Sequence, residues 1–382
     1  MELDGLLQTV VRDGASDLIL KSGSFPAMRL HGRVRFIADE RMTPEVTRQA
    51  LVRLLRADGA AALESQGALD VPFEVPEIGR FRVNIFKQNG RPSFVFRHVR
   101  REIPGFQELH LPVSPLKKLS THRRGLVLST GVAGSGKSTT MASMIEHINQ
   151  TESRHIVTIE DPIEFIFEDR LSIISQREVG VDCPDFATAL KHAVRQAPDV
   201  IFLGEMRDRE TIEAGIHAAE TGHLVFSTLH TVNAVQTVER MILHFPPHEH
   251  PLIRQQLSLN LAGVISQRLV PAENNQGLFP AIELMLATPA VREILNEGRT
   301  RDLPHALSEG DYWGTMTFNQ SLRRLVETGN ISVESALESS DNPDELKLQL
   351  RGINPGGKHT MDLPPPPSPR RREATGARPR EY

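Results

Sequence analysis

The sequence predicts an α/β protein in which a mainly parallel sheet, covered by helices on both faces, follows a smaller α/β domain. From about residue 116 to 272, short apolar segments alternate with helical segments, a pattern typical of parallel sheets. A glycine-rich run at residues 131–138 lies between one apolar segment and one helical segment. Residues 1–100 mix helical signals with the apolar-polar alternation of half-buried strands. These observations indicate two α/β units of different size.

The length of the chain also favours two domains, because 382 residues exceed what one hydrophobic core normally needs. We place an N-terminal domain at 1–100, a linker rich in Pro and charge at 101–115, and a second domain at 116–355. Residues 356–382 are rich in Pro and Arg and carry too few apolar side chains to fold alone. We expect this tail to be disordered.

Composition excludes several classes of protein. Hydrophobic residues make up 39% of the chain and charged residues 24%, and no apolar stretch reaches the roughly 18 residues that span a bilayer. The N-terminus lacks the features of a secretory signal, and the one cysteine, Cys183, cannot form an internal disulfide, so we expect a cytoplasmic protein. A net charge of −4 gives no global attraction for nucleic acid, and we expect none to bind.

Individual elements follow from short apolar runs and their periodicity. The helix after the glycine-rich run is expected at residues 139–148, and residues 280–350 are predicted to be mainly helical. Strands are expected at residues 17–20, 79–86, 125–130, 156–159, 200–203 and 224–228.

The run at residues 131–138 fits the phosphate-binding pattern G-x-x-x-x-G-K-S without mismatch. Its glycines let the backbone turn tightly and direct N–H groups inward, Lys137 adds a positive charge, and Ser138 offers a hydroxyl to Mg²⁺. An ordinary glycine-rich turn usually lacks the flanking strand and helix. We expect ATP or GTP to bind with Mg²⁺ at Gly131, Val132, Ala133, Gly134, Ser135, Gly136, Lys137, Ser138 and Thr139.

Carboxylates follow the strand expected at residues 156–159, namely Glu160, Asp161 and Glu164. Parallel sheets bind ligands at the carboxyl ends of their strands, so these side chains should lie near the phosphate loop. A carboxylate there can hold the attacking water in line or reach Mg²⁺. A solvated acidic turn is the alternative, which this position after a strand makes less attractive.

The strand at residues 200–203 resembles a Walker B strand that ends at Glu205. Asp199 precedes the strand, about 20 Å from Glu205 along an extended chain, so only one of the two can serve Mg²⁺. We assign Glu205 to the metal and Asp199 to a structural cap. Arg207 is placed to pair with a carboxylate or with the γ-phosphate.

Two histidines, His223 and His230, flank the strand expected at residues 224–228. About 23 Å of extended chain separates them, so they are not expected to share one metal or one phosphate. His230, at the carboxyl end, is the candidate γ-phosphate sensor, with a purely structural role as the alternative. His223 lies at the opposite edge, where it packs structurally or meets a neighbouring subunit.

The ordered motifs GVAGSGKS, TIEDPIEF, REVG, PDVIFLGEMRDRET and AAETGHLVFSTLHT resemble the secretion ATPases of bacterial type IV pili, and most of all the PilT/PilU retraction motors. The resemblance covers residues 1 to about 350. It implies a PAS-like N-terminal domain, a RecA-like ATPase core and a hexameric ring with ATP between subunits. By motif position it implies that Glu164 is catalytic, Glu205 is the Walker B acid, and the histidine box runs from His223 to His230.

Within that family, the cysteine count separates retraction from assembly. The assembly and secretion ATPases usually carry a four-cysteine zinc module, which one cysteine cannot build. Residues 290–297 also resemble AIRNLIRE, the retraction element of PilT proteins. Ala290, Arg292 and Glu297 agree with it, whereas Glu293 and Asn296 depart from it. Retraction is therefore favoured, and the choice between PilT and PilU stays open.

A ring motor needs a positive charge donated across the subunit boundary to the γ-phosphate. The candidates are Arg82, Arg97, Arg195 and Arg207. Arg82 and Arg97 belong to the N-terminal domain, which could swing over a neighbour's nucleotide. Ordinary surface pairing with carboxylates is the alternative for each.

The motifs predict ATP hydrolysis, and the resemblance to the PilT/PilU family implies a hexameric motor for pilus retraction. Glu164 positions the water, Lys137 neutralises phosphate charge, Ser138 and Glu205 hold Mg²⁺, and His230 reports the γ-phosphate. Expected partners are an inner-membrane platform protein, at whose cytoplasmic face the motor would lie, and a paralogous PilT/PilU motor. The alternatives are another secretion or DNA-translocating ring ATPase, or a nucleotide-sensing accessory subunit.

Overall fold

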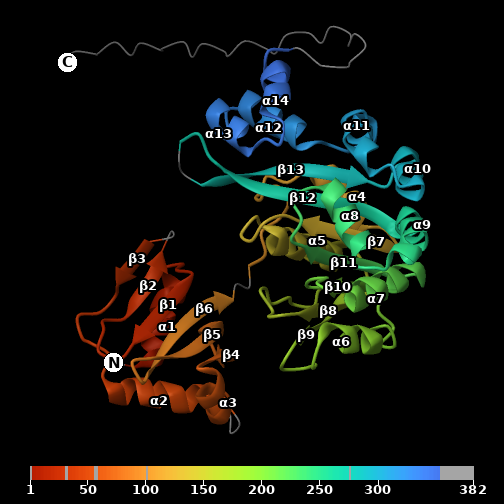
Figure 1. The fold of residues 1–382 in the computed structure, drawn as a ribbon. Helices are drawn as coiled ribbons and strands as arrows, with labels where there is room; N and C mark the ends of the chain where they lie inside the picture. Colours follow the sequence, from red (N-terminus) through yellow and green to blue (C-terminus); the bar gives the residue numbers. More distant parts are fainter. Residues whose placement is uncertain (1, 31–32, 56–58, 100–101, 275–276, 353–382) are drawn as a thin grey trace, which may run out of the picture.

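The computed structural model describes residues 2–30, 33–55, 59–99, 102–274 and 277–352, which form an N-terminal domain and a larger second domain (Figure 1). The tail expected at residues 356–382 lies outside the described residues. Among the described residues, no helix combines the length and the apolar character needed to cross a membrane.

The N-terminal domain is a six-stranded antiparallel sheet in the order β3-β2-β1-β6-β5-β4. Strand β5 alternates buried apolar and half-exposed polar side chains, so its apolar side faces the helices. The elements are α1 (Leu3–Arg12), β1 (Asp17–Lys21), β2 (Ala27–Leu30), β3 (Arg33–Phe36), α2 (Pro44–Leu54), α3 (Gly59–Gln66), β4 (Ala68–Val75), β5 (Gly79–Gln88) and β6 (Arg91–Val99).

The second domain contains a seven-stranded sheet in the order β13-β12-β7-β11-β10-β8-β9. All neighbouring pairs are parallel except β12 and β13. The strands are β7 (Gly125–Thr130), β8 (His155–Glu160), β9 (Ile173–Glu178), β10 (Val200–Leu203), β11 (Leu224–Leu229), β12 (Leu261–Pro271) and β13 (Leu278–Leu286).

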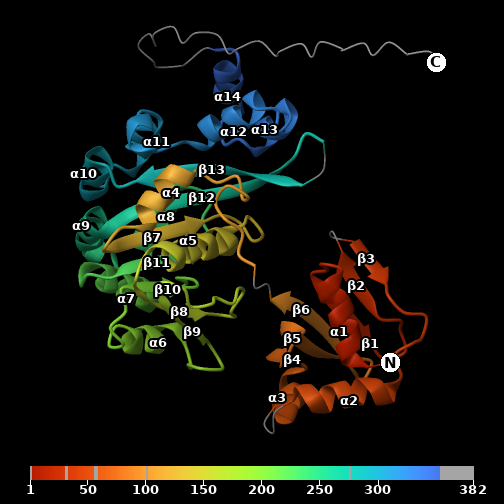
Figure 2. The same ribbon diagram turned by 180° about the vertical axis from the view of Figure 1, so that it is seen from behind.

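Helices cover both faces of this sheet because side chains of successive strand residues point to opposite faces (Figures 1 and 2). On β7, Leu126 and Leu128 join one apolar cluster and Val127 joins the other. The first cluster includes residues of α6 (Phe186–Ala193), α7 (Arg209–Glu220), α8 (Ala234–Leu243), α9 (His250–Asn260), α10 (Pro289–Glu297) and α11 (Leu303–Ser308). The second includes α4 (Val113–Ser120) and α5 (Lys137–Thr151).

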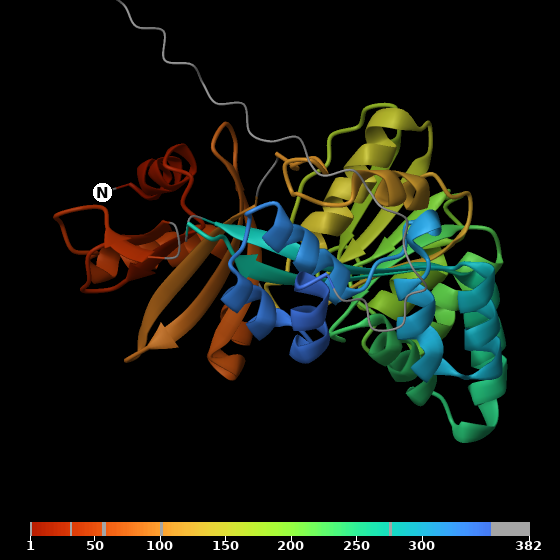
Figure 3. The same cartoon turned by 90° about the horizontal axis from the view of Figure 1, so that it is seen from above.

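The C-terminal helices α12 (Phe318–Glu327), α13 (Val333–Ser339) and α14 (Pro343–Leu350) pack on the β12–β13 hairpin through a separate apolar cluster. Figure 3 shows these helices, in blue, lying across the hairpin. Short 3₁₀ turns at Pro247–Glu249, Thr300–Asp302 and Asp311–Trp313 complete the domain.

Two sequence-based expectations need correction here. Residues 280–350 are mainly helical, but β13 occupies 278–286, because this almost continuous apolar run pairs with β12 as the edge strand of the sheet rather than forming a helix. The expected linker at 101–115 is partly built into the second domain. Phe106 and Leu111 are buried in its core, and α4 already begins at Val113.

An ion pair between Arg80 and Glu178 joins the two domains. The guanidinium Nη2 of Arg80 on β5 lies 2.9 Å from Oε2 of Glu178, the last residue of β9. Glu178 is only 8% exposed, so this pair is shielded from solvent far better than an ordinary surface pair. The next residue, Val179, donates its N–H to the carbonyl of Glu160 at the end of β8. The N-terminal domain thus contacts β9, the edge strand beside β8, and β8 ends at Glu160.

Candidate active site

The glycine-rich run forms a tight loop between β7 and α5, and its shape depends on glycine. Gly131 has φ 146°, and a Cβ there would collide with the Gln267 carbonyl and the Ser135 side chain. Gly136 has φ 94° and would meet the Gln267 amide in the same way. Gln267 itself accepts the Thr140 hydroxyl at 2.7 Å. Strand β12 therefore packs so closely behind the loop that side chains are excluded.

Lys137 opens α5 and turns its side chain back over the loop. Its Nζ donates to the carbonyls of Gly131 at 2.8 Å and Val132 at 3.0 Å. Burial lowers the pKa of Lys137, and the negative charges of Glu205 and Glu164 oppose that effect. The positive charge of Lys137 therefore interacts with the negative charges of both Glu205 and Glu164.

A cavity of about 270 Å³ lies at the carboxyl ends of β7, β8, β10 and β11. Residues from all four strand ends reach it because parallel strands end at one edge of the sheet. The polar residues lining it include Lys137, Ser138, Glu160, Asp161, Glu164, Glu205, Arg207, Thr228 and His230.

Glu205 is bound on both sides. Its Oε2 accepts the Nε–H of Arg207 at 2.7 Å, and its Oε1 lies 3.3 Å from Nε2 of His230. The bond to Glu205 raises the pKa of Arg207. Arg207 also lies 4.0 Å from Asp161. The acid after β10 and the histidine after β11 are therefore in direct contact, as their shared sheet edge suggests.

Glu160 and Glu164 occupy different environments although only three residues separate them. Glu160 is buried, and it accepts the Thr158 hydroxyl at 2.7 Å and the Gln176 amide at 3.2 Å. Burial raises the pKa of Glu160 to about 7, against the hydrogen bonds from Thr158, Gln176 and the Glu164 backbone. Glu164 is exposed and lines the cavity. Of the two, Glu164 is the carboxylate that solvent water can reach.

The other predicted residues lie elsewhere. His223 is at the opposite end of β11, where its Nδ1 lies 2.9 Å from the Ala218 carbonyl. Asp199 accepts the His155 N–H at 2.9 Å, which is a structural contact. Arg195 is exposed after α6 and does not line the cavity.

Arg82 and Arg97 are neighbours on the sheet of the N-terminal domain, as register partners on β5 and β6. Arg82 pairs with Asp70 at 3.3 Å, and Arg97 pairs with the buried Asp17 at 3.0 Å. Their cross-strand register places both arginines on one face of that sheet.

Sequence reasoning missed three residues that shape the site. Gln267 supports the phosphate loop, and Thr228 donates its hydroxyl to the Gly204 carbonyl at 2.6 Å. Gln176 accepts the Phe167 N–H at 2.9 Å and donates to the Phe165 carbonyl at 2.9 Å, which holds the segment carrying Glu164. Gln267 and Thr228 act on segments 127 and 24 residues away, and Gln176 acts on the irregular segment before its own strand, so no local pattern marks any of the three.

The fold and the cavity together define a phosphate-loop ATPase. Residues 2–301 match the family described as type II/IV secretion system protein. The type IV pilus ATPase PilU of Pseudomonas aeruginosa is 38% identical over 364 residues, which cover 95% of both chains. The type IV pilus retraction ATPase PilT of the same organism is 40% identical over 346 residues, covering 91% of this chain and all of that one.

The solved structures agree with this assignment. A crystal structure of the pilus retraction motor PilT with bound ADP matches with a TM-score of 0.84 and 43% identity, over 91% of this chain and 99% of that one. The ATPase DotB of Legionella pneumophila matches with a TM-score of 0.73 and 27% identity, over 92% of this chain and 95% of that one. This chain belongs to the type II/IV secretion system protein family, and within it to the PilT/PilU pilus ATPases. It is an ATP hydrolase, and the predicted fold class is confirmed.

Replacement of Gly131 by Ala tests the packing of the phosphate loop. The added Cβ collides with backbone, and φ 146° disfavours alanine, so we expect nucleotide affinity to fall more than about tenfold. Titration with a fluorescent ATP analogue measures this. Gly222→Ala is the matched control, because Gly222 also has positive φ, yet open space surrounds its Cβ position. Equal affinities for the two variants would contradict the account.

The raised pKa of Glu160 predicts a pH dependence of stability. An acid with a folded pKa of about 7, above the ordinary 4.5, favours folding while it is protonated. Its contribution is full below about pH 4.5 and is lost as pH rises through 7, a change of at most roughly 3 kcal/mol. Glu160→Gln cannot titrate, so its unfolding free energy should fall less between about pH 5 and pH 8 than that of the wild type.

Urea unfolding at several pH values measures this difference, with exposed Glu168→Gln as the control. Identical pH profiles for wild type and Glu160→Gln would show that Glu160 does not titrate as its burial requires.

Proposed function

We propose that this chain is the ATPase motor that powers retraction of type IV pili. The observation that carries the proposal is the single cavity that brings Lys137, Glu164, Glu205 and His230 together in a chain of the PilT/PilU group. The relatives named for twitching and for retraction are each 40% identical to this chain and cover 85% and 91% of it.

Five of the residues that line the cavity have a defined task in the proposed phosphoryl transfer to water. Lys137 neutralises charge on the β- and γ-phosphates, and Glu164, which water can reach, holds the attacking water in line. The residues present fit Mg²⁺, since a hydroxyl at Ser138 and a carboxylate at Glu205 line one cavity beside the phosphate loop. Mg²⁺, when bound there, would offset the charge that develops on phosphate oxygens. His230 contacts Glu205 and thereby reports the state of the γ-phosphate.

We propose a hexameric ring in which arginines of one N-terminal domain reach the nucleotide of a neighbour. Arg82 and Arg97 are the favoured candidates because they are adjacent on one face of the N-terminal sheet. Each pairs with a carboxylate of its own domain, and it would exchange that pair for the phosphate of a neighbour. Arg207 pairs with Glu205 within its own chain, so it is better suited to organise the local site.

The ring would act at the cytoplasmic face of the inner membrane on a platform protein, with a paralogous motor as a further partner. A DNA-translocating ATPase is the alternative, and stimulation of ATP turnover by DNA would favour it.

Mixing two inactive variants tests donation of an arginine in trans. We expect Arg97→Ala and Glu164→Ala each to reduce ATP turnover strongly, on the order of 10²-fold or more, because each removes a group that acts in the transition state. A mixture of the two should recover part of the activity, since some sites combine an intact arginine with an intact glutamate. Phosphate release measures both. Full activity of Arg97→Ala alone would contradict its assignment.

Deletion of the gene in the source organism tests the direction of the motor. A retraction motor removes pilin from the fibre, so surface pili should accumulate while twitching motility is lost. Electron microscopy and a motility assay measure these outcomes. Loss of surface pili would instead indicate an assembly motor.

A further inference from the structure

A row of side chains crosses the sheet directly behind the cavity. In register, Leu229 of β11 pairs with Thr130 of β7, Thr130 pairs with Ser266 of β12, and Ser266 pairs with Glu283 of β13. The Thr130 hydroxyl donates to the Ser266 hydroxyl at 3.0 Å. Thr130 immediately precedes the phosphate loop, and Leu229 immediately precedes His230. The row therefore ends on β13 at the carboxylate of Glu283, which has no role in the proposed hydrolysis.

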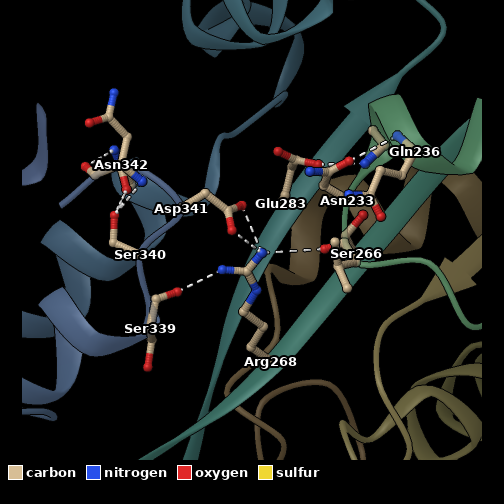
Figure 4. Close-up of polar contacts among 12 residues, drawn as sticks. Asn233, Gln236, Ser266, Arg268, Glu283, Ser339, Ser340, Asp341 and Asn342 are labelled. Atoms are coloured by element: carbon tan, nitrogen blue, oxygen red, sulfur yellow. Dashed lines mark hydrogen bonds and ion pairs between the residues drawn. The ribbon is translucent and has the colours of Figure 1, made fainter.

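Glu283 reaches from this row to the start of α8. Its Oε1 accepts the N–H of Ala234, the first residue of α8, at 2.7 Å. The first N–H groups of a helix have no partner inside the helix and carry partial positive charge, so a carboxylate there fixes the helix end. Asn233 caps the same turn by accepting the Gln236 N–H at 2.9 Å (Figure 4).

Two charged groups act on Glu283, namely Arg268 of β12 and Asp341, which lies between α13 and α14. Burial raises the pKa of Glu283 to about 7, and Asp341 raises it further, whereas the Ala234 N–H, Arg268 and Ser266 lower it. Arg268 of β12 binds both Asp341 oxygens at 2.7 Å and the Ser339 carbonyl at 2.7 Å (Figure 4). Because Arg268 forms its ion pair with Asp341, the main contact of Glu283 is the hydrogen bond from the Ala234 N–H and not an ion pair with Arg268.

Only three residues, 231–233, separate His230 from the helix start that Glu283 holds. The upstream end of this segment is fixed in the sheet at Leu229. The segment is also pinned internally, because the hydroxyls of Thr231 and Thr237 lie 2.7 Å apart. So short a segment, held at both ends, cannot absorb a displacement of the start of α8. Such a displacement would therefore also move His230.

We infer that Glu283 is a positioning residue for ATP hydrolysis, which holds the start of α8 through the Ala234 N–H and thereby keeps His230 in contact with Glu205. This inference rests on the proposed role of His230. The length of the Glu283 side chain, and not its charge, is what lets it reach the Ala234 N–H and hold the start of α8.

Two conservative variants separate reach from charge. Glu283→Gln keeps an oxygen at the same distance and loses the charge, so we expect kcat within about twofold of the wild type. Glu283→Asp keeps the charge and loses one methylene of reach, so we expect kcat to fall about fivefold to tenfold, with KM unchanged within about twofold. The exposed Glu338→Ala on α13 serves as the control and should match the wild type.

Steady-state phosphate release by the full chain, with His230→Ala and the double variant His230→Ala/Glu283→Asp, completes the test. Because Glu283 acts through His230, the double variant should have the kcat of His230→Ala alone. Additive losses, a wild-type kcat for Glu283→Asp, or a larger loss for Glu283→Gln than for Glu283→Asp would each overturn the inference. Wild-type kcat for His230→Ala would instead contradict the proposed role of His230 itself.

Discussion

The parallel pairing of β7, β8, β10 and β11 determines where the site residues of the second domain lie. Parallel strands end at the same edge, so the phosphate loop, the acidic segment, Glu205 and His230 converge without any special long-range contact. Both faces of each strand must then be apolar, which explains the two clusters of buried residues on either side of the sheet. The chemistry and the core are thus consequences of one hydrogen-bonding pattern.

The same edge separates carboxylates by environment. Glu160 is buried and Glu283 is half-buried, burial raises both pKa values, and each carboxylate accepts hydrogen bonds from neighbouring protein groups. Glu164 is exposed and lines the cavity, and Glu205 lies between a guanidinium and an imidazole. Glu160 and Glu283, which lie within strands, therefore hold neighbouring groups in place. Glu164 and Glu205, which follow strand ends, can face phosphate and water.

Sequence patterns predicted much of this architecture because the relevant signals are local. The strands at residues 125–130 and 200–203 occupy the expected positions, and the phosphate loop is marked by its glycines and by Lys137. The support from Gln267 could not be predicted, since it depends on β12 packing behind the loop more than 100 residues later. Strand β13 was mistaken for helix, because a continuous apolar run has no decisive period. The roles of the individual site residues stay predictions.

We propose that Glu164 and Glu205 act on bound nucleotide at one hydrolytic site. Single-turnover phosphate release from Mg²⁺-ATP, with affinity for a fluorescent ATP analogue measured in parallel, tests this assignment. For Glu164→Gln, we expect affinity within a fewfold of the wild type and a rate lower by on the order of 10²-fold or more, because the water loses its acceptor while the phosphate loop is intact. Wild-type turnover in Glu164→Gln, or loss of nucleotide binding instead of turnover, would rule out this role for Glu164.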